Sequence, residues 1–357
     1  MRRRRLLQTL AAVLGFGLFF VPGCKVGYLL SSGYYQAELL ALREPVEELR
    51  GTGRLSPEQE AKLDVVRDAK TWGASIGLKA TDNYESMSLE WERQIWNVSA
   101  CDPVQFEGKR WWFPVVGSFP YLGFFREEDA RELESELKGD GYDVYVRTAG
   151  AYSTLGVFKD PILPGMLEWS DWALAETVFH ELAHATLWVP GSVKFNESFA
   201  NFVGEVAVMR YWQETYGAHD PELLNQVQRE ADLKLWRELL HALYEDLNAV
   251  YTDETLTDEQ KLERKRQLYE DDLPARVAAT PFYQPLRFEK AVDTGTWNNA
   301  RMMQFKTYNT NAELFAALLV ENDYDLLAFI EAVGTITEGR GGDPFQKLKA
   351  HLGVSEE

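Results

Sequence analysis

Two histidines four residues apart, with a glutamate directly after the first, constrain this chain more than any other feature. They form the segment His180-Glu181-Leu182-Ala183-His184. Residues four apart lie on the same side of an α-helix, so both imidazoles can reach one metal ion. Glu181 stands beside that ion without ligating it, where its carboxylate can act as a general base toward water. The motif therefore predicts a helix that carries a catalytic Zn²⁺ site, with one ion per chain.

A hydrolytic zinc site needs a third protein ligand, which leaves the fourth position to water. The candidate is Glu197, in the segment Asn196-Glu197-Ser198-Phe199-Ala200. Before it, Val189-Pro190-Gly191-Ser192 has the composition of a turn, so a second helix can return beside the first. Glu205 would share a face with Glu197, and there it either hydrogen-bonds a ligand imidazole or is a solvated carboxylate.

The N-terminus has the layout of a secretory signal. Arg2–Arg5 precede an apolar run over 6–21, which ends at Pro22-Gly23-Cys24 and resembles the lipobox of bacterial lipoproteins. We therefore expect a signal peptide over 1–23 and lipidation of Cys24. The alternatives are an uncleaved anchor and ordinary cleavage. With Lys25 after the cysteine, the expected location is the bacterial envelope, as a periplasm-facing lipoprotein anchored in the outer membrane.

Charge and cysteine content exclude several classes of protein. The formal net charge is −19 at pH 7, and removal of Arg2–Arg5 would make the chain still more acidic. Nucleic acid is therefore not expected as a partner, and membrane attachment would come from the acyl chains on Cys24. The chain has 2 cysteines, so lipidation of Cys24 would leave Cys101 without an intramolecular disulfide partner. Nothing in the sequence fixes the oligomeric state.

The chain divides into a helical start, a strand-rich middle and a helical remainder. We expect an N-terminal helical segment over 24–95, with helices near 28–50, 57–73 and 85–94. The strand-rich part, 96–160, combines strands near 96–101, 111–116, 142–146 and 151–158 with a helix over 127–137. The part over 161–357 holds the zinc site and a helical hairpin over 221–281. The predicted fold class is α+β, mainly helical, with a small mixed or antiparallel sheet beside the metal helix.

Two polar clusters are candidates for substrate binding. Extended substrate can add a strand to an exposed sheet edge, which makes the segment Tyr152, Ser153 and Thr154 a candidate, unless it is simply a half-buried strand. A peptidase also needs a hydrogen-bond donor for the developing oxyanion, and Tyr308 can supply it. Asn298, Asn299 and Arg301 can hold substrate backbone. Helix capping and ordinary buried hydrogen bonds are the alternative for the asparagines.

Four segments together resemble a family of bacterial putative zinc aminopeptidases of the lipoprotein type. They are Ala151-Tyr152-Ser153-Thr154-Leu155-Gly156, the histidine motif, the Glu197 segment, and Asn298-Asn299-Ala300-Arg301 with Tyr308. The resemblance spans nearly the whole mature chain. It implies a zincin-like, gluzincin-like metallopeptidase that hydrolyses peptides. Carried over to this chain, His180, His184 and Glu197 are the zinc ligands and Glu181 is the general base.

The chain departs from familiar gluzincins in two respects. The interval to the third ligand is shorter than in thermolysin-like enzymes, and there is no Gly-x-Met-Glu-Asn segment. An aminopeptidase must bind a free N-terminal ammonium, and the sequence identifies no acidic residue for that task. Two alternatives therefore stay open beside the aminopeptidase. One is a non-catalytic zinc-containing envelope scaffold or assembly factor, and the other is a metal-dependent amidase that acts on cell-wall peptides.

Overall fold

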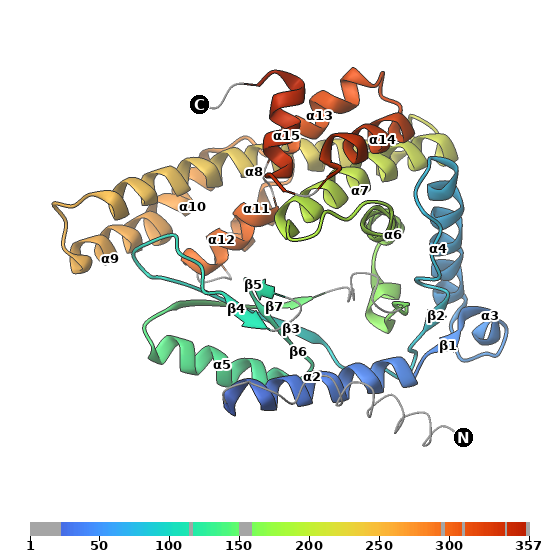
Figure 1. The fold of residues 1–357 in the computed structure, drawn as a ribbon, viewed down its shortest axis with the longest axis horizontal. Helices are drawn as coiled ribbons and strands as arrows, with labels where there is room; N and C mark the ends of the chain where they lie inside the picture. Colours follow the sequence, from blue (N-terminus) through green and yellow to red (C-terminus); the bar gives the residue numbers. More distant parts are fainter. Residues whose placement is uncertain are drawn as a thin grey trace.

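The computed structural model describes residues 23–113, 117–149, 159–293, 297–308, 311–339 and 341–354. Over these ranges the protein is mainly helical, with small antiparallel sheets, so the predicted α+β class is confirmed (Figure 1). The helices are α2 (Gly23–Ala41), α3 (Val46–Leu49), α4 (Pro57–Ser75), α5 (Glu127–Gly139), α6 (Asp171–Thr186), α7 (Val193–Tyr216), α8 (Pro221–Thr252), α9 (Asp258–Gln267), α10 (Leu273–Ala279), α11 (Pro285–Asp293), α12 (Asn299–Tyr308), α13 (Ala312–Glu321), α14 (Leu326–Thr337) and α15 (Pro344–Leu352). A 3₁₀ turn, Pro164–Glu168, precedes α6, and a π-helical turn, Leu268–Asp272, joins α9 to α10.

Three small sheets contain all the strands of the described residues. β3 (Ile95–Cys101) lies between β6 (Leu122–Phe124) and β7 (Asp143–Ala149), antiparallel to both. β4 (Trp111–Phe113) pairs with β5 (Gly117–Phe119), and β1 (Glu44–Pro45) pairs with β2 (Ser86–Met87). Side chains alternate across β7, so the three-stranded sheet has two different faces. Val144 and Val146 pack on the α5 side, whereas Tyr145 faces Arg301 of α12.

The largest apolar core surrounds α6 and α7, which pack side by side with α4 against them (Figure 1). Phe179 of α6 is fully buried, and its ring meets Trp72 of α4 and Tyr211 of α7. Gly204 of α7 faces α6 directly, because a Cβ there would lie 3.2 Å from the Glu176 carbonyl oxygen and 3.4 Å from the His180 Cβ. A residue without a side chain thus lets the two helices come close.

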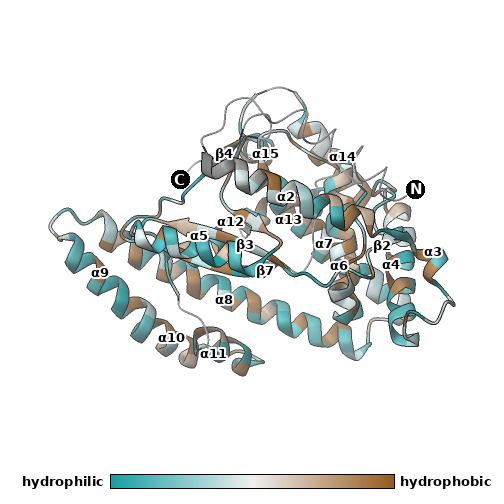
Figure 2. Ribbon diagram, turned by 90° about the horizontal axis from the view of Figure 1, so that it is seen from below, coloured by the Kyte–Doolittle hydropathy of each residue, from teal (hydrophilic) through white to brown (hydrophobic). Residues whose placement is uncertain are grey.

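The chain forms a long helical hairpin after α7. α8 runs out and α9 and α10 return along it, with a separate apolar cluster around Trp236, Leu240 and Leu273. Figure 2 shows that the residues of α9 are mostly hydrophilic. Lys265 of α9 reaches the sheet, because its ammonium lies 2.6 Å from the Asp143 carboxylate of β7. The hairpin is therefore held to the sheet by a largely buried ion pair as well as by apolar packing.

Two helical predictions near the N-terminus are wrong. The helix expected over 28–50 ends at Ala41, and Pro45, which cannot donate a backbone hydrogen bond, lies in β1 before the short α3. The segment 85–94 is not helical: Ser86–Met87 forms β2, and Met87 and Trp91 are buried in the main core. The strand expected over 151–158 lies outside the described residues. In the part of the chain that is described, no helix is long and apolar enough to span a membrane.

Candidate metal centre

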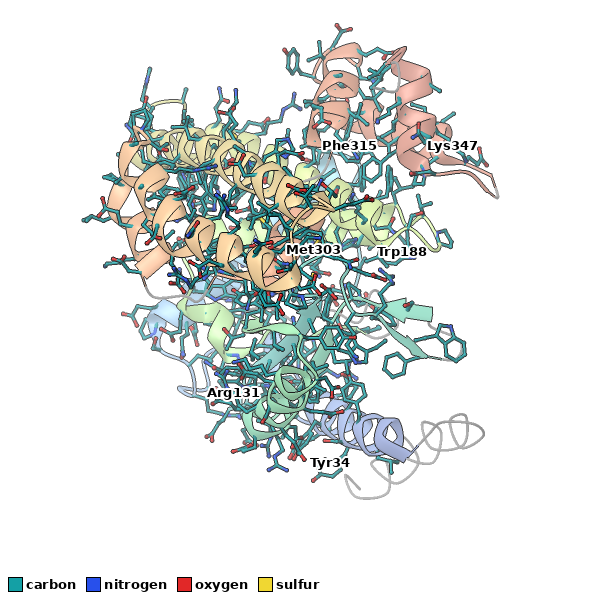
Figure 3. All side chains as sticks on the ribbon, turned by 90° about the vertical axis from the view of Figure 1, so that its left-hand side faces the viewer. Tyr34, Arg131, Trp188, Met303, Phe315 and Lys347 are labelled. Carbon is teal, nitrogen blue, oxygen red and sulfur yellow. The ribbon has the colours of Figure 1, made fainter. Side chains whose placement is uncertain are left out.

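Helix α6 places the two histidines of the motif. Its start is fixed by Ser170, whose hydroxyl accepts a hydrogen bond from the Ala173 amide at 3.2 Å. The rings of His180 and His184 follow one turn apart, with centroids 4.6 Å apart. Trp188, labelled in Figure 3, comes just after the helix, and its ring lies 5.6 Å from that of His184. The expected helix and the common face of the two imidazoles are therefore present.

The turn after α6 brings Glu197 back to the histidines. Asn196 holds this turn with both ends of its amide: Oδ1 accepts from the Val189 amide at 2.8 Å, and Nδ2 donates to the Val189 carbonyl at 2.9 Å. Asn196 is buried, so both bonds are shielded from water. Glu197 is the next residue, in the second turn of α7. The role of Asn196 is therefore structural: it holds the turn that places Glu197 beside the histidines.

The three expected ligands converge on one point. Nε2 of His180 lies 3.7 Å from one Glu197 carboxylate oxygen, and Nε2 of His184 lies 3.7 Å from the other. One ligand atom from each residue can be chosen so that all lie within 4.8 Å of one another. Two ligands at about 2.0 Å from a tetrahedral Zn²⁺ would be about 3.3 Å apart, a little less than the observed separation. The group can therefore hold a metal ion, and its two nitrogens and one carboxylate suit zinc.

The protonation states of the ligands also favour a cation. Burial lowers the pKa of His180 to about 4, and the nearby His184 adds to this effect, so the imidazole is neutral at neutral pH and one ring nitrogen keeps a free lone pair. Asn201, one turn after Glu197, hydrogen-bonds the His180 side chain and orients it. Burial opposes ionisation of Glu197, but the two imidazoles and Arg147 outweigh it and hold the pKa of its carboxyl below the ordinary value. The centre thus presents a neutral His180 imidazole and an ionised Glu197 carboxylate, with the His184 ring beside them.

Glu181 is buried beside the ligands, with 8 % of its surface exposed. Sequence reasoning missed its neighbour Tyr84, whose buried hydroxyl lies in the field of the Glu181 and Asp160 carboxylates. Burial and these two negative charges raise the pKa of Tyr84 well above its ordinary value. Tyr84 also has a left-handed backbone, with φ of 64°, held by a hydrogen bond from its amide to the Asp160 carbonyl at 2.8 Å. Strained aromatic residues of this kind concentrate at functional sites, but no sequence motif indicated this one.

Arg147 is a second residue that the sequence did not single out. It lies on β7 two positions after Tyr145, and therefore on the same face of the sheet, toward α12. Its positive charge acts on Glu197, so β7 approaches the metal centre at this end. The only sequence signal was a cation near the end of an expected strand.

Glu205 does not take the role of orienting a ligand imidazole, which belongs to Asn201. Burial and the charges of Glu230 and Glu176 raise the pKa of Glu205 to about 7, while Arg237 partly offsets them. Glu176 has a raised pKa for the same two reasons, burial and Glu230. Glu205 therefore belongs to a group of partly buried carboxylates that includes Glu176 of α6. It is not a fully solvated carboxylate, because burial is the main cause of its raised pKa.

The asparagines near α12 connect this helix to the sheet. Asn298 caps α12, since its Oδ1 accepts from the Arg301 amide at 3.0 Å, and its Nδ2 donates to the Val144 carbonyl at 2.9 Å. Arg301 lies over the rings of Trp297 and Tyr145 and donates to the Ala291 carbonyl. Substrate binding by Asn298 and Arg301 stays a prediction.

Asn299 serves the fold, which is the alternative considered for it. It has no exposed surface, and its Oδ1 accepts from the Tyr251 and Tyr269 hydroxyls at 2.8 and 3.1 Å. Its Nδ2 donates to the Asp102 and Pro103 carbonyls at 3.0 and 3.2 Å. The amide therefore joins the helical hairpin to the end of β3.

Three other predictions concern residues whose side chains are not described. Tyr308 is the last residue of α12, and Cys24 lies in the first turn of α2. Tyr152, Ser153 and Thr154 lie outside the described residues. Their predicted roles as oxyanion donor, lipidation site and substrate-binding strand stay predictions.

Replacement of Asn299 by alanine should destabilise the fold. It would leave two tyrosine hydroxyls and two carbonyls short of a partner in a buried place, at a cost of about 2–4 kcal/mol. Urea unfolding monitored by circular dichroism measures this loss. The matched control is Asn225→Ala, an exposed position, where the change should be under about 0.5 kcal/mol. Equal stability of the two variants would show that the Asn299 network is not structural.

Comparison with known proteins adds one match. The model of a family described as "Putative aminopeptidase" matches residues 27–343, which include the three expected metal ligands and Glu181. No curated protein and no solved structure matches the chain.

Proposed function

Because the chain belongs to the putative aminopeptidase family, we propose that it is a zinc-dependent peptidase whose centre is His180, His184 and Glu197. Family membership supports a peptidase-type activity, and the convergence of the three residues supports a metal-dependent one. The observation that carries the proposal is the pair of 3.7 Å separations between the two imidazoles and the two Glu197 oxygens, with Glu181 beside them. Structural zinc sites usually have four protein ligands, whereas three leave a position for water.

Zinc bound at this centre would lower the pKa of a coordinated water and polarise the scissile carbonyl. The residues of the chain divide the remaining work. Glu181 accepts a proton from the attacking water and then passes it to the amine of the leaving peptide. Arg147 keeps Glu197 ionised, and Asn201 holds the His180 ring in place. Tyr308 donates a hydrogen bond to the oxyanion, while the segment 152–154 binds extended substrate.

We further propose that the mature protein faces the periplasm and is held at the outer membrane by acyl chains on Cys24. The supporting observations are the basic start, the apolar run over 6–21 and the Gly23-Cys24 pair that follows. The anchor would then be attached in the first turn of α2. The substrate would be a peptide that reaches the periplasm.

The test is a mixed peptide library incubated with protein that begins at Lys25, with added Zn²⁺ and, separately, with a chelator. Products are identified by mass spectrometry. Zinc-dependent release of single N-terminal residues would support an aminopeptidase, and internal cuts would keep the chemistry but change the class. Cleavage of cell-wall peptides alone would favour the amidase. Bound zinc without any cleavage of either substrate would favour the scaffold and contradict the proposal.

A further inference from the structure

Tyr28, in the second turn of α2, packs against aromatic residues of β4 and β6. The Tyr28 ring is 6.0 Å from that of Phe113 in β4 and 5.2 Å from that of Phe124 in β6. Figure 3 shows the green β4–β5 pair projecting from the body of the molecule. Tyr28 is four residues after Cys24, which is about 6 Å along a helix axis. The strand pair is therefore close to the proposed attachment point of the acyl chains.

Trp112 projects from this strand pair into solvent. Its neighbours Trp111 and Phe113 are buried on the other face of β4, as strand alternation requires. Trp112 itself is 61 % exposed. An exposed indole in water leaves a large apolar surface unburied. In a bilayer interface the same side chain buries its ring and keeps its N–H hydrated, which is why tryptophan is enriched there.

The charge pattern around Trp112 differs from the rest of the chain. Residues 108–126 contain no aspartate or glutamate, although the whole chain has 56 of them and a net charge of −19. The same stretch contains Lys109 and Arg110 directly before Trp111. Arg110 is held across the strand pair by the Ser118 hydroxyl at 3.1 Å and by the Ser118 carbonyl at 3.0 Å. The first turn of α2 also lacks acidic residues. Residues 108–126 thus form an aromatic, weakly basic region in an acidic protein.

We propose that β4 and the first turn of α2 form a membrane-contact surface, with Trp112 in the interfacial layer and Arg110, two residues before it and exposed, over anionic headgroups. This inference rests on the proposed lipid anchor at Cys24. The acyl chains on Cys24 would hold the protein to the bilayer, and a second membrane contact would add to that attachment. It also limits rotation about the anchor, because the surface touches the membrane at two places. Peptide cleavage does not depend on it.

The test uses protein that begins at Lys25 and vesicles of phosphatidylethanolamine with one quarter phosphatidylglycerol. Co-sedimentation should show weak binding by the unmodified chain. Trp112→Ala should weaken it about tenfold, since one large apolar side chain is lost from the contact. The matched control is Tyr283→Ala, which removes an aromatic side chain that is 64 % exposed and lies just before α11. This control should bind as the unmodified chain does.

A second variant places the indole itself. Trp112→Phe should retain most of the binding. The fraction of tryptophan fluorescence that brominated lipid quenches should be smaller in this variant than in the unmodified chain. No vesicle binding, or equal binding by Trp112→Ala, would overturn the inference. Loss of peptide cleavage in Trp112→Ala with unchanged vesicle binding would also overturn it, because the indole would then contact substrate. Peptide cleavage tests the proposed function, and vesicle binding tests the membrane-contact surface. Failure of one proposal can therefore be distinguished from failure of the other.

Discussion

Glu181→Gln should abolish peptide cleavage while metal binding stays intact. The carboxylate is the base proposed to accept a proton from the attacking water, and a positioned general base contributes about 10²–10⁴-fold to rate. Glutamine has nearly the same shape but cannot accept that proton at neutral pH. Because Glu181 is 8 % exposed, a carboxamide in its place removes a buried negative charge and should not weaken the fold. The measurement is kcat/KM on the best library peptide, together with zinc content by elemental analysis.

The matched control is Glu176→Gln, one turn earlier on α6. The pKa of Glu176 is raised by burial and by Glu230, so its side chain already favours the neutral form relative to an ordinary glutamate. The change should therefore leave cleavage within about twofold, because no interaction specific to the transition state is lost. Unchanged turnover in Glu181→Gln would remove Glu181 from the mechanism. Loss of zinc in that variant would make Glu181 a ligand instead of a base.

Glu197→Ala should lower the affinity for zinc by at least about 100-fold. Replacement of groups that only orient a ligand costs about 10–100-fold, and Glu197 would be a ligand itself. The two imidazoles would remain, and burial and the nearby His184 would still hold the pKa of His180 below its ordinary value. Competition with a fluorescent zinc chelator measures the affinity, and peptide cleavage should fall with occupancy.

Glu205→Gln on the same helix is the control for this variant. Its side chain lies among Glu176 and Glu230, and Asn201 is the residue that hydrogen-bonds His180. Zinc affinity should therefore stay as in the unmodified protein. Equal affinity in the Glu197 and Glu205 variants would move the third-ligand role to another residue.

The sequence predicted that His180, His184 and Glu197 come together, because the signals for this arrangement are local. The histidine motif lies within one helix, and Ser170 marks the start of that helix in the sequence as in the structure. The turn at Val189-Pro190-Gly191-Ser192 is also encoded locally, since Gly191 has φ of 82°. The return of Glu197 follows from a short turn between two helices. These steps need no knowledge of distant contacts.

Contacts between distant segments explain what the sequence did not predict. Met87 lies in an extended segment because it pairs with Glu44 of β1 and is buried in the core, although local patterning favoured a helix. Tyr84 lies about 100 residues before Glu181 in the sequence, and Arg147 lies about 50 residues before Glu197, so no local pattern could connect them to the centre. Asn299 looked like a substrate residue because a polar side chain in sequence does not show which carbonyls surround it.

The close approach at Gly204 couples the spacing of two helices to the geometry of the metal ligands. His180 and His184 lie on α6 and Glu197 lies on α7, so the distances between the three proposed ligands depend on how far apart the helices are. A methyl group at position 204 would press on the Glu176 carbonyl and on the His180 Cβ, and the helices would have to separate by a few tenths of an ångström. Metal preference could thus be tuned from a position that binds no metal, because cations with longer bonds suit a wider pair of helices.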